Sequence, residues 1–385
     1  MLSVAIDVGP LHGPRTGVGN AVAWSIDELR RLGAAWGDEH EHGDAEAQPF
    51  KVQLLPYLTS MRSRVSPPTR RLPLPAAAAH RLWQRADRPH LDRWLGRPDL
   101  VHGTNYVVPP TRCPRLVSVY DCWFLEHPGD ASPDVARAGE ILRRSIGSGA
   151  HVVTSSQATA DRLREFVPTD RLDVIHLGPP PVDATPSDAA MPSATPPRFG
   201  HLDGASFVVS IGTVERRKNV PSLVRAFGRL AAEHAQARLV VAGRPGDDQA
   251  EVDRALADLD PATRARVDTF GQISSEEKRW LLAHATALAY PSLDEGFGFP
   301  ILEAQQAGVP VVASSAGSIP EVAGTGALLS APLDTEALAA NLHWVLTSDH
   351  QRQILIDKGT RNLDRFSWTT TARSYFDLYA RLSAP

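Results

Sequence analysis

Two glutamates with seven residues between them are the first candidates for ligand binding. They are Glu295 and Glu303, in the segment DEGFGFPILEAQQAG at 294–308. Gly296 and Gly298 allow the backbone to approach a ligand closely, and a helix is predicted to follow. Two carboxylates placed this way can contact one ligand from two sides, and the free N–H groups of a helix N-terminus favour an anion such as diphosphate. The alternative is that both glutamates are solvated residues that offset the helix dipole.

A basic turn in SIGTVERRKNV, residues 210–220, is the second candidate. Gly212 allows a tight turn after a predicted strand, Arg217 and Lys218 bring two positive charges to the start of a helix, and Asn219 is the expected N-cap. Such a pair can clamp a diphosphate and stabilise it as it leaves with extra charge. The alternative is a solvated basic turn. Only four of the 40 basic residues are lysines, so a lysine kept here favours phosphate binding.

A glycine-bearing loop near the N-terminus is a third candidate. In GPLHGPRTGVGN at 9–20, Gly17 and Gly19 come just before a predicted helix. The loop lacks the third glycine of a dinucleotide fingerprint. It is therefore either a loop that approaches a phosphate or an ordinary structural turn.

Polar side chains also stand at the ends of two other strands of the first half. His102 belongs to HGTNYVVPP, and Tyr120 and Asp121 belong to VSVYDCWFLEHP. Because α/β folds bind ligands at the carboxyl edge of the sheet, Asp121 is a candidate to contact a ligand. His102 is either a polar contact for that ligand or a structural residue.

The sequence predicts no metal site. The one short acidic Asp-x-Asp string, from Asp258 to Asp260, precedes a proline at the end of a predicted surface helix. No His/Cys cluster has zinc spacing, and the two cysteines, Cys113 and Cys122, fit neither a disulfide framework nor a paired zinc motif. We therefore expect no metal and no resident cofactor.

Alternating strands and helices must position these candidates. In the first half, apolar runs alternate with helical stretches, and the same alternation restarts after the proline-rich segment 178–204, with the strands FVVSIG, ARLVVAG, VDTFG, ALAYPS and VPVVAS. The alternation predicts parallel sheets with helices on both faces. In the first half the strands are expected at 2–8, 51–58, 99–102, 115–120, 151–154 and 172–177, and the helices at about 20–32, 76–95, 134–147 and 156–166.

The predicted organisation is therefore an α/β protein of two Rossmann-like, doubly wound domains. The first domain is expected at 1–180, the linker at 181–204 and the second domain at 205–365. A last helix at 366–385 is expected to pack back on the N-terminal domain. Polar or proline-rich insertions are expected at 37–49 and 62–75.

The second half resembles the retaining glycosyltransferases of family 4, which have the GT-B fold of two such domains facing a central cleft. The resemblance rests on GTVERRKNV, VVAGR, FGQISSEEK, YPSLDEGFGFPILEA and VVASSAGSIPEVAG, which occur in this order. It implies that the N-terminal domain is on the acceptor side and the second domain holds the donor, that Glu295 meets donor-sugar hydroxyls and that Glu303 meets the nucleotide ribose. Mannosyltransferase-like members often have His-Asp where this chain has Tyr120-Asp121, and this departure weakens any inference about the acceptor.

The resemblance implies transfer of a hexose from a nucleotide diphosphate sugar to an acceptor hydroxyl, with retention of configuration and without a metal. SIPEVAG and FSWTTTA favour mannose from GDP-mannose, and the acceptor is a glycan, a lipid-linked sugar or a small metabolite. Alternatives are an epimerase or hydrolase of the same fold, or a silent nucleotide-sugar-binding protein.

The resemblance also assigns roles to residues of this chain. The expected catalytic residues are Arg217, Lys218, Glu295 and Asp121, and the acceptor-side candidates are His102 and Tyr120. The expected donor-binding residues are Gly17, Gly19, Gly212, Gly243, Arg244, Gln272, Gly296, Phe297, Gly298, Phe299 and Glu303.

Length and composition limit the number of domains, the kinds of partner and the location that can be expected. At 385 residues the chain suits two domains, and a formal net charge of -4 argues against a broad nucleic-acid surface. No apolar stretch reaches the roughly 18 residues that span a bilayer, and we expect a cytoplasmic protein. The arginines at 62–71 and 81–97 are either a weak peripheral contact with a membrane or an ordinary solvated face.

Overall fold

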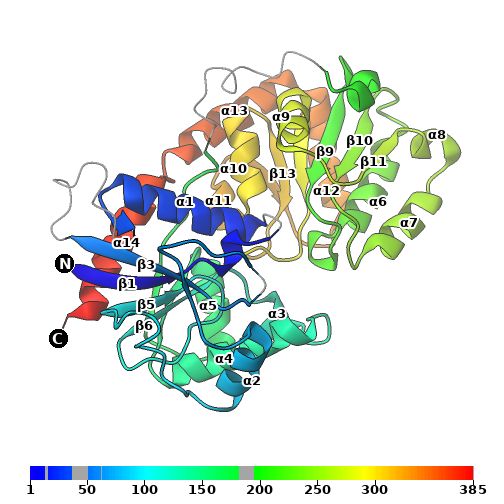
Figure 1. Cartoon of the computed structure of the whole chain (residues 1–385). Helices are drawn as coiled ribbons and strands as arrows, with labels where there is room; N and C mark the ends of the chain where they lie inside the picture. Colours follow the sequence, from blue (N-terminus) through cyan, green and yellow to red (C-terminus); the bar gives the residue numbers. More distant parts are fainter. Residues whose placement is uncertain (14–15, 37–50, 62, 182–194, 385) are drawn as a thin grey trace. The chain divides into compact units, whose positions relative to one another are not determined.

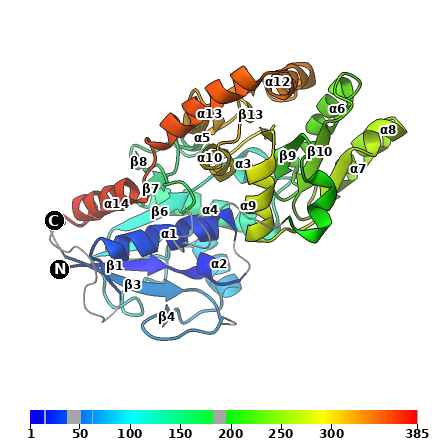
Figure 2. The ribbon, with the colours of Figure 1, turned by 90° about the horizontal axis from the view of Figure 1, so that it is seen from above.

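The computed structural model describes residues 1–13, 16–36, 51–61, 63–181 and 195–384. Contacts divide the chain into two units, the first containing Met1–Gly178 and Ser367–Pro385 and the second Pro179–Phe366 (Figures 1 and 2). The expected insertion at 37–49 and most of the expected linker lie outside the described residues. Residues 195–204 of that linker belong to the second unit, where Phe199 and Leu202 are fully buried in the core.

The first unit is built on a parallel sheet. Its described strands follow the order β2-β3-β1-β5-β6-β7-β8, with β4 paired to β3, and every pairing is parallel. Apart from β4, which consists of two arginines, the strands are short and mainly apolar, as expected for a sheet covered on both faces. They are β1 Leu2–Asp7, β2 Ala35–Trp36, β3 Val52–Leu58, β4 Arg70–Arg71, β5 Leu100–Gly103, β6 Arg115–Val119, β7 His151–Thr154 and β8 Leu172–Val174.

Helices cover both faces of this sheet, because successive strand residues point to opposite sides. Val4 and Ile6 of β1 pack in a core with α1 and α14, whereas Ala5 packs in the core under α2 and α4. The helices are the 3-10 turn η1 Gly9–Leu11, α1 Gly17–Arg31, α2 Ala76–Arg85, α3 Trp123–Glu126, α4 Pro133–Gly147, α5 Gln157–Phe166 and α14 Trp368–Ser383.

The second unit is likewise a parallel sheet with helices on both faces. Its described strands follow the order β11-β10-β9-β12-β13-β14, and all are parallel. The strands are β9 Phe207–Ile211, β10 Arg238–Ala242, β11 Val267–Phe270, β12 Ala287–Tyr290, β13 Val311–Ser314 and β14 Ala327–Ser330. One face is covered by α6 Val220–Leu230, α7 Gln249–Ala257 and α12 Thr335–Thr347, and the other by η3 Pro197–Leu202, α9 Ser275–His284, α10 Phe299–Gln306 and α11 Ile319–Ala323. The remaining elements are η4 Arg216–Lys218, α8 Pro261–Arg264 and α13 Asp349–Leu363.

Two local predictions were wrong. The helix expected at 76–95 ends at Arg85, because Pro89 lacks an amide donor and disfavours helical backbone in the residue before it. Asn219 is not a side-chain cap of α6: it adopts the left-handed conformation with φ 52°, and Nδ2 of its side chain donates to the carbonyl of Pro291 at 3.1 Å. Asn219 thus joins the segment after β9 to the segment after β12.

Candidate active site

The basic turn and Glu295 meet at the point in the second sheet where the strand order reverses. In the order β11-β10-β9-β12-β13-β14, the neighbours β9 and β12 are not consecutive in the chain. Open α/β sheets bind ligands outside the carboxyl ends of strands at such a switch point. Arg217 and Lys218 follow β9, and Glu295 follows β12. The topology therefore brings together residues more than 70 positions apart.

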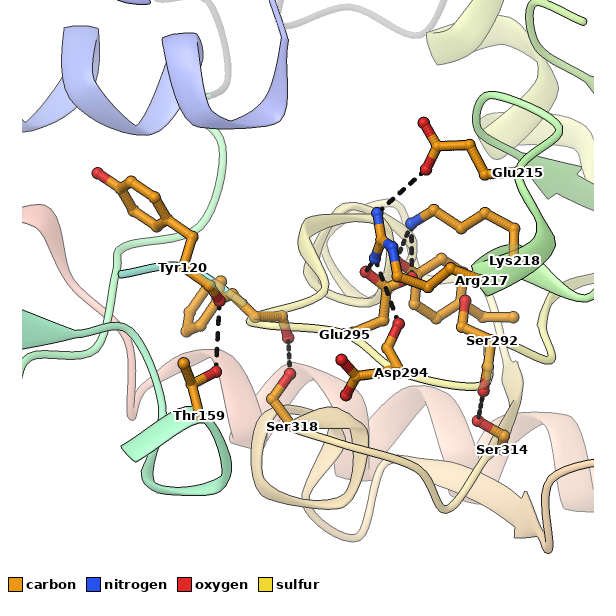
Figure 3. A network of polar contacts seen from close by, with 12 residues as sticks. Tyr120, Thr159, Glu215, Arg217, Lys218, Ser292, Asp294, Glu295, Ser314 and Ser318 are labelled. Carbon is orange, nitrogen blue, oxygen red and sulfur yellow. Dashed lines mark hydrogen bonds and ion pairs between the residues drawn. The ribbon is translucent and has the colours of Figure 1, made fainter. Parts of the chain in front are cut away.

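The carboxylate of Glu295 lies between two cations (Figure 3). The Arg217 guanidinium donates to Oε2 of Glu295 at 2.5 Å, and Nζ of Lys218 donates to Oε1 at 2.5 Å. Nζ also donates to the hydroxyl of Tyr290 at 3.0 Å and lies 5.0 Å from the centre of that ring. Arg217 further donates to the Asp294 carbonyl at 3.2 Å and to Glu215 at 3.3 Å. These contacts hold Arg217, Lys218, Glu295 and Glu215 in a single network.

Burial makes this network electrostatically strong. The side chain of Glu295 is 6% exposed, that of Lys218 17% and that of Arg217 19%. Burial alone would raise the pKa of Glu295, but the neighbouring Arg217 and Lys218 outweigh it and lower the pKa to about 2. Burial lowers the pKa of Lys218, and Glu295 opposes that change. In the buried part of the network two cations share one carboxylate, whereas the second carboxylate, that of Glu215, is 41% exposed. The positive charge of Arg217 and Lys218 is therefore only partly compensated inside the site, which suits an anion.

The backbone around Glu295 is fixed by a neighbouring turn. The amide of Ser318 donates to the Glu295 carbonyl at 3.0 Å, and its hydroxyl donates to the Phe297 carbonyl at 3.0 Å. Gly317 has φ 52°, and a Cβ there would lie 2.3 Å from Oδ1 of Asp294 and 2.7 Å from the backbone of Glu295. Only glycine fits between this turn and the glutamate.

The helix that follows, α10, offers its N-terminus beside the cluster. Gly298 precedes the helix with φ 99°, a conformation that favours glycine. Gly296 and Phe297 are buried, and the Phe297 and Phe299 rings pack edge to face at 5.3 Å. The first N–H groups of a helix have no intrahelical partner, which suits a phosphate group at this end.

Glu303 is paired rather than solvated. On α10, its carboxylate accepts from Nζ of Lys278 on α9 at 2.5 Å. Lys278 is not among the candidates predicted from the sequence. The rarity of lysine could have indicated it, because two of the four lysines contact Glu295 and Glu303, the two glutamates of the segment 294–308. Tyr290 was missed as well, since its contact with Lys218 spans 72 positions.

The other donor candidates of the second unit follow β9, β10 and β11 at the same edge of the sheet. A Cβ on Gly243 would lie 1.7 Å from the carbonyl oxygen of Gly212, so the two glycines let the loops after β9 and β10 touch. Arg244 and Gln272 are exposed. The Gln272 carbonyl accepts from Arg198 at 3.4 Å.

In the first unit, the glycine loop forms the start of α1. Gly17 is the first helical residue, and the side chain of Thr16 caps the helix by accepting from the amide of Gly19 at 3.1 Å. A Cβ on Gly19 would lie 2.7 Å from the carbonyl oxygen of Pro10. Close packing within the loop is therefore one reason for glycine at position 19.

His102 is a buried structural residue in this unit. It is 3% exposed, and its ring nitrogens lie 2.8 Å from the hydroxyls of Tyr379 and Ser118. Burial lowers its pKa to about 3, so the ring is neutral at physiological pH. These contacts favour the structural alternative over a contact with an acceptor, because both ring nitrogens are already engaged.

Tyr120 and Asp121 follow β6 and are both partly exposed. The Tyr120 ring packs against the core that contains α14, and its carbonyl accepts from Thr159 at 3.3 Å. Asp121 contacts Tyr106, whose pKa is raised by burial and by this carboxylate. Both remain predicted acceptor-side residues.

The Asp-x-Asp string has a structural role. Asp260 caps α8 by accepting from the amides of Ala262 and Thr263 at 3.0 and 3.1 Å. Elsewhere in the described part of the chain, one group could hold an ion: Glu233, His234 and His343 have possible ligand atoms within 4.8 Å of one another. Sequence spacing missed this group because 109 positions separate the two histidines.

Two family models match the chain. The model described as Glycosyl transferases group 1 matches residues 194–362, and the model described as Glycosyltransferase Family 4 matches residues 35–182. O-antigen chain mannosyltransferase B of Escherichia coli is 29% identical over 396 residues, which cover 97% of this chain and 98% of that protein. A D-inositol 3-phosphate glycosyltransferase of Xylanimonas cellulosilytica is 28% identical over 407 residues, which cover 98% and 95%.

Solved structures share the whole architecture. Sucrose-phosphate synthase from Thermosynechococcus elongatus is 19% identical, has a TM-score of 0.68 and covers 99% of this chain and 99% of its own. The likeness confirms the expected GT-B fold. Among the described helices, none has both the length and the apolar character needed to cross a membrane.

Proposed function

The chain belongs to the group 1 glycosyl transferases of family 4, and from this premise we propose that it transfers mannose from GDP-mannose to a hydroxyl of a glycan-type acceptor, with retention of configuration and without a metal. The second unit holds the nucleotide sugar, and the first unit holds the acceptor. The cluster of Arg217, Lys218 and Glu295 at the β9/β12 switch point is the observation that carries the donor part of this proposal.

Arg217 and Lys218 at the switch point supply the positive charge that a metal ion would otherwise supply to the leaving diphosphate. The diphosphate of a nucleotide sugar gains negative charge as it leaves, and preorganised donors in a partly buried site stabilise such charge strongly. Arg217 and Lys218 are partly buried and held by Glu295, and the N-terminus of α10 adds backbone donors. We infer that these groups bind the diphosphate.

Glu295 acts as a hydrogen-bond acceptor in this proposal. Its pKa of about 2 keeps it ionised at physiological pH, so it cannot donate a proton. It orients the sugar by accepting from sugar hydroxyls and positions the two cations. In the transfer itself, the bond between the anomeric carbon and the diphosphate oxygen breaks, the acceptor oxygen bonds to that carbon on the same face, and the acceptor proton passes to the leaving phosphate.

Mannose is proposed because one relative that matches nearly the full length of the chain is an O-antigen chain mannosyltransferase. Guanine as the base rests on the resemblance of SIPEVAG and FSWTTTA to mannosyltransferase-type members. The relatives leave the acceptor open, since another full-length relative is named for inositol 3-phosphate.

The test is a transfer assay with purified full-length protein, GDP-mannose and a mannose-terminated glycoside, with UDP-glucose and UDP-galactose as alternative donors. We expect an α-linked product from GDP-mannose, identified by NMR, and no product from the UDP-sugars. Turnover without an acceptor would indicate an epimerase or hydrolase, and binding of GDP without turnover on any acceptor would indicate a silent binding protein.

A matched pair of lysine variants tests the site. Lys218→Ala is expected to lower kcat/KM by roughly a hundredfold or more, the usual cost of removing a donor that stabilises developing charge. Lys358→Ala changes an exposed lysine of α13 in the same unit and should leave the rate unchanged. Equal rates in the two variants would remove Lys218 from the mechanism.

A further inference from the structure

Three side chains that can bind a metal ion lie close together in the second unit. They are Glu233, His234 and His343, and the ligand atoms that they offer all lie within 4.8 Å of one another. Nε2 of His234 lies 2.9 Å from Nδ1 of His343, and Oε2 of Glu233 lies 3.3 Å from the same Nδ1. Two imidazole nitrogens and one carboxylate oxygen are thus gathered at one place.

The spacing of these atoms matches the spacing of ligands around one ion. Zinc binds imidazole nitrogen at about 2.0–2.1 Å and carboxylate oxygen at about 2.0–2.2 Å. Two ligands that are both about 2.1 Å from an ion lie about 3.0 Å apart in octahedral geometry and about 3.4 Å apart in tetrahedral geometry. The separations of 2.9 and 3.3 Å agree with these values, so the three side chains can bind one ion with only small shifts.

The backbone holds both histidines in place. His234 lies in the turn after α6, where its carbonyl accepts from the amide of Ala237 at 3.0 Å and from the guanidinium of Arg266 at 2.7 Å. His343 lies in α12, and buried side chains of α6 and α12 pack in one core. Because the ligands come from two elements that are already packed together, little conformational freedom is lost when an ion binds.

The group is open to solvent. The side chain of His343 is 41% exposed and that of Glu233 70%, so an ion can enter from water and keep water molecules at its remaining positions. One of the two facing ring nitrogens carries a hydrogen, whereas a bound ion needs the lone pair of each. Binding therefore releases this proton to water.

The ligand atoms indicate the class of ion. Mg²⁺ and Ca²⁺ prefer oxygen ligands, whereas imidazole suits Zn²⁺, Ni²⁺ and Cu²⁺. Two of the three ligands here are imidazoles, and the carboxylate of Glu233 adds one negative charge. The set therefore favours a divalent transition metal over Mg²⁺ or Ca²⁺.

The group lies at the edge of the sheet opposite to the cluster at the switch point. Glu233 and His234 lie between the end of α6 and the start of β10, at the amino end of that strand, whereas Glu295 follows the carboxyl end of β12. In a parallel sheet the two edges are separated by the length of a strand, about 15 Å for five residues. An ion bound here is therefore too far away to contact a diphosphate at the switch point.

We propose that Glu233, His234 and His343 bind a divalent transition-metal ion such as Zn²⁺, which joins α12 to the turn after α6 and stabilises the second unit. The inference goes beyond the proposed function and does not depend on it, because this ion takes no part in sugar transfer. An ion that binds only the folded chain raises its stability by mass action.

Isothermal titration calorimetry with Zn²⁺ tests the site. The full-length protein is prepared without a polyhistidine tag, treated with EDTA and then freed of the chelator. We expect one Zn²⁺ per chain to bind, and Mg²⁺ should give no binding at the same concentrations. Zn²⁺ at about 100 times its dissociation constant should raise the melting temperature by about 3 °C or more.

Three variants assign the binding to this group. His234→Ala and His343→Ala each remove one ligand, and each should weaken Zn²⁺ binding at least about tenfold and abolish the thermal shift. His201→Ala is the matched control. The His201 side chain is 44% exposed, belongs to the same unit and lies 3.1 Å from a carboxylate oxygen of Asp268, so this variant should bind Zn²⁺ like the wild type.

Two further measurements separate a lost ligand from a damaged fold. Circular dichroism of the metal-free proteins checks that each variant folds. Electron paramagnetic resonance of the Cu²⁺-loaded protein counts the nitrogen ligands, and we expect two in the wild type and one in His343→Ala.

Several results would overturn the proposal. If Zn²⁺ neither binds nor raises the melting temperature, the two histidines only bond to each other. Unchanged affinity in both His234→Ala and His343→Ala would place the ion elsewhere among the 14 histidines of the chain, and equal affinity for Mg²⁺ would contradict imidazole ligands. Binding without a thermal shift would contradict the joining of α12 to the turn. None of these measurements uses a nucleotide sugar, so failure of the proposed function leaves them unaffected.

Discussion

Replacing Glu295 with glutamine tests whether its carboxylate really compensates two buried cations. The pKa of Glu295 is lowered from 4.5 to about 2 in the folded protein, and each pKa unit corresponds to about 1.4 kcal/mol. The ionised carboxylate therefore contributes about 3 kcal/mol to the free energy of unfolding at pH 7. Glu295→Gln keeps the size of the side chain and removes this charge, so the variant should be less stable by about that amount.

The effect has a defined pH dependence. Because the folded pKa lies below the unfolded value, the stabilisation is fully present above pH 4.5 and is lost as the pH falls from about 4.5 towards 2. The difference between wild type and variant should thus be largest near pH 7 and shrink below pH 4.5. Urea denaturation followed by circular dichroism at pH 7, 5 and 3.5 measures it.

An added anion should rescue the variant. Without the carboxylate, Arg217 and Lys218 are left without their buried partner, and pyrophosphate can take its place. Pyrophosphate should therefore raise the melting temperature of Glu295→Gln more than that of the wild type. The control is Glu251→Gln, which breaks a more exposed ion pair with Arg254 on α7 and should cost less than about 1 kcal/mol.

A free energy of unfolding for Glu295→Gln within about 0.5 kcal/mol of the wild type at pH 7 would show that the carboxylate does not compensate the two cations. An equal loss of stability at pH 7 and pH 3.5 would indicate a packing defect, because a packing defect, unlike a lost charge, does not depend on the titration of this carboxyl group.

Three further outcomes are expected. Gly317→Ala should destabilise the protein and weaken GDP binding, measured by calorimetry, because a Cβ would collide with the backbone of Glu295; Gly200→Ala, where a Cβ meets nothing within 4 Å, should do neither. Glu303→Gln should weaken GDP binding about tenfold in the same assay with little change in kcat, since a lost charged hydrogen bond costs about 1.5 kcal/mol; unchanged affinity would remove Glu303 from the nucleotide site. EDTA should leave transfer unaffected, and strict dependence on an added divalent ion would refute catalysis by fixed cations alone.

The sequence was most informative about local structure, which is determined by residues that are neighbours along the chain. Alternating apolar runs and helical stretches indicated two parallel α/β sheets, because period and length are local properties. The glycine before α10 and the basic turn after β9 were likewise readable, since each depends on a few adjacent residues. The gathering of Arg217, Lys218 and Glu295 could also be anticipated, because the carboxyl ends of parallel strands lie at one edge of a sheet.

Contacts between distant segments were decided only by the tertiary structure. The pairing of Lys278 with Glu303 and of Lys218 with Tyr290 depends on which side chains α9, α10 and β12 present to one another. The contact of Nδ1 of His102 with the Tyr379 hydroxyl depends on α14, which begins 266 positions later.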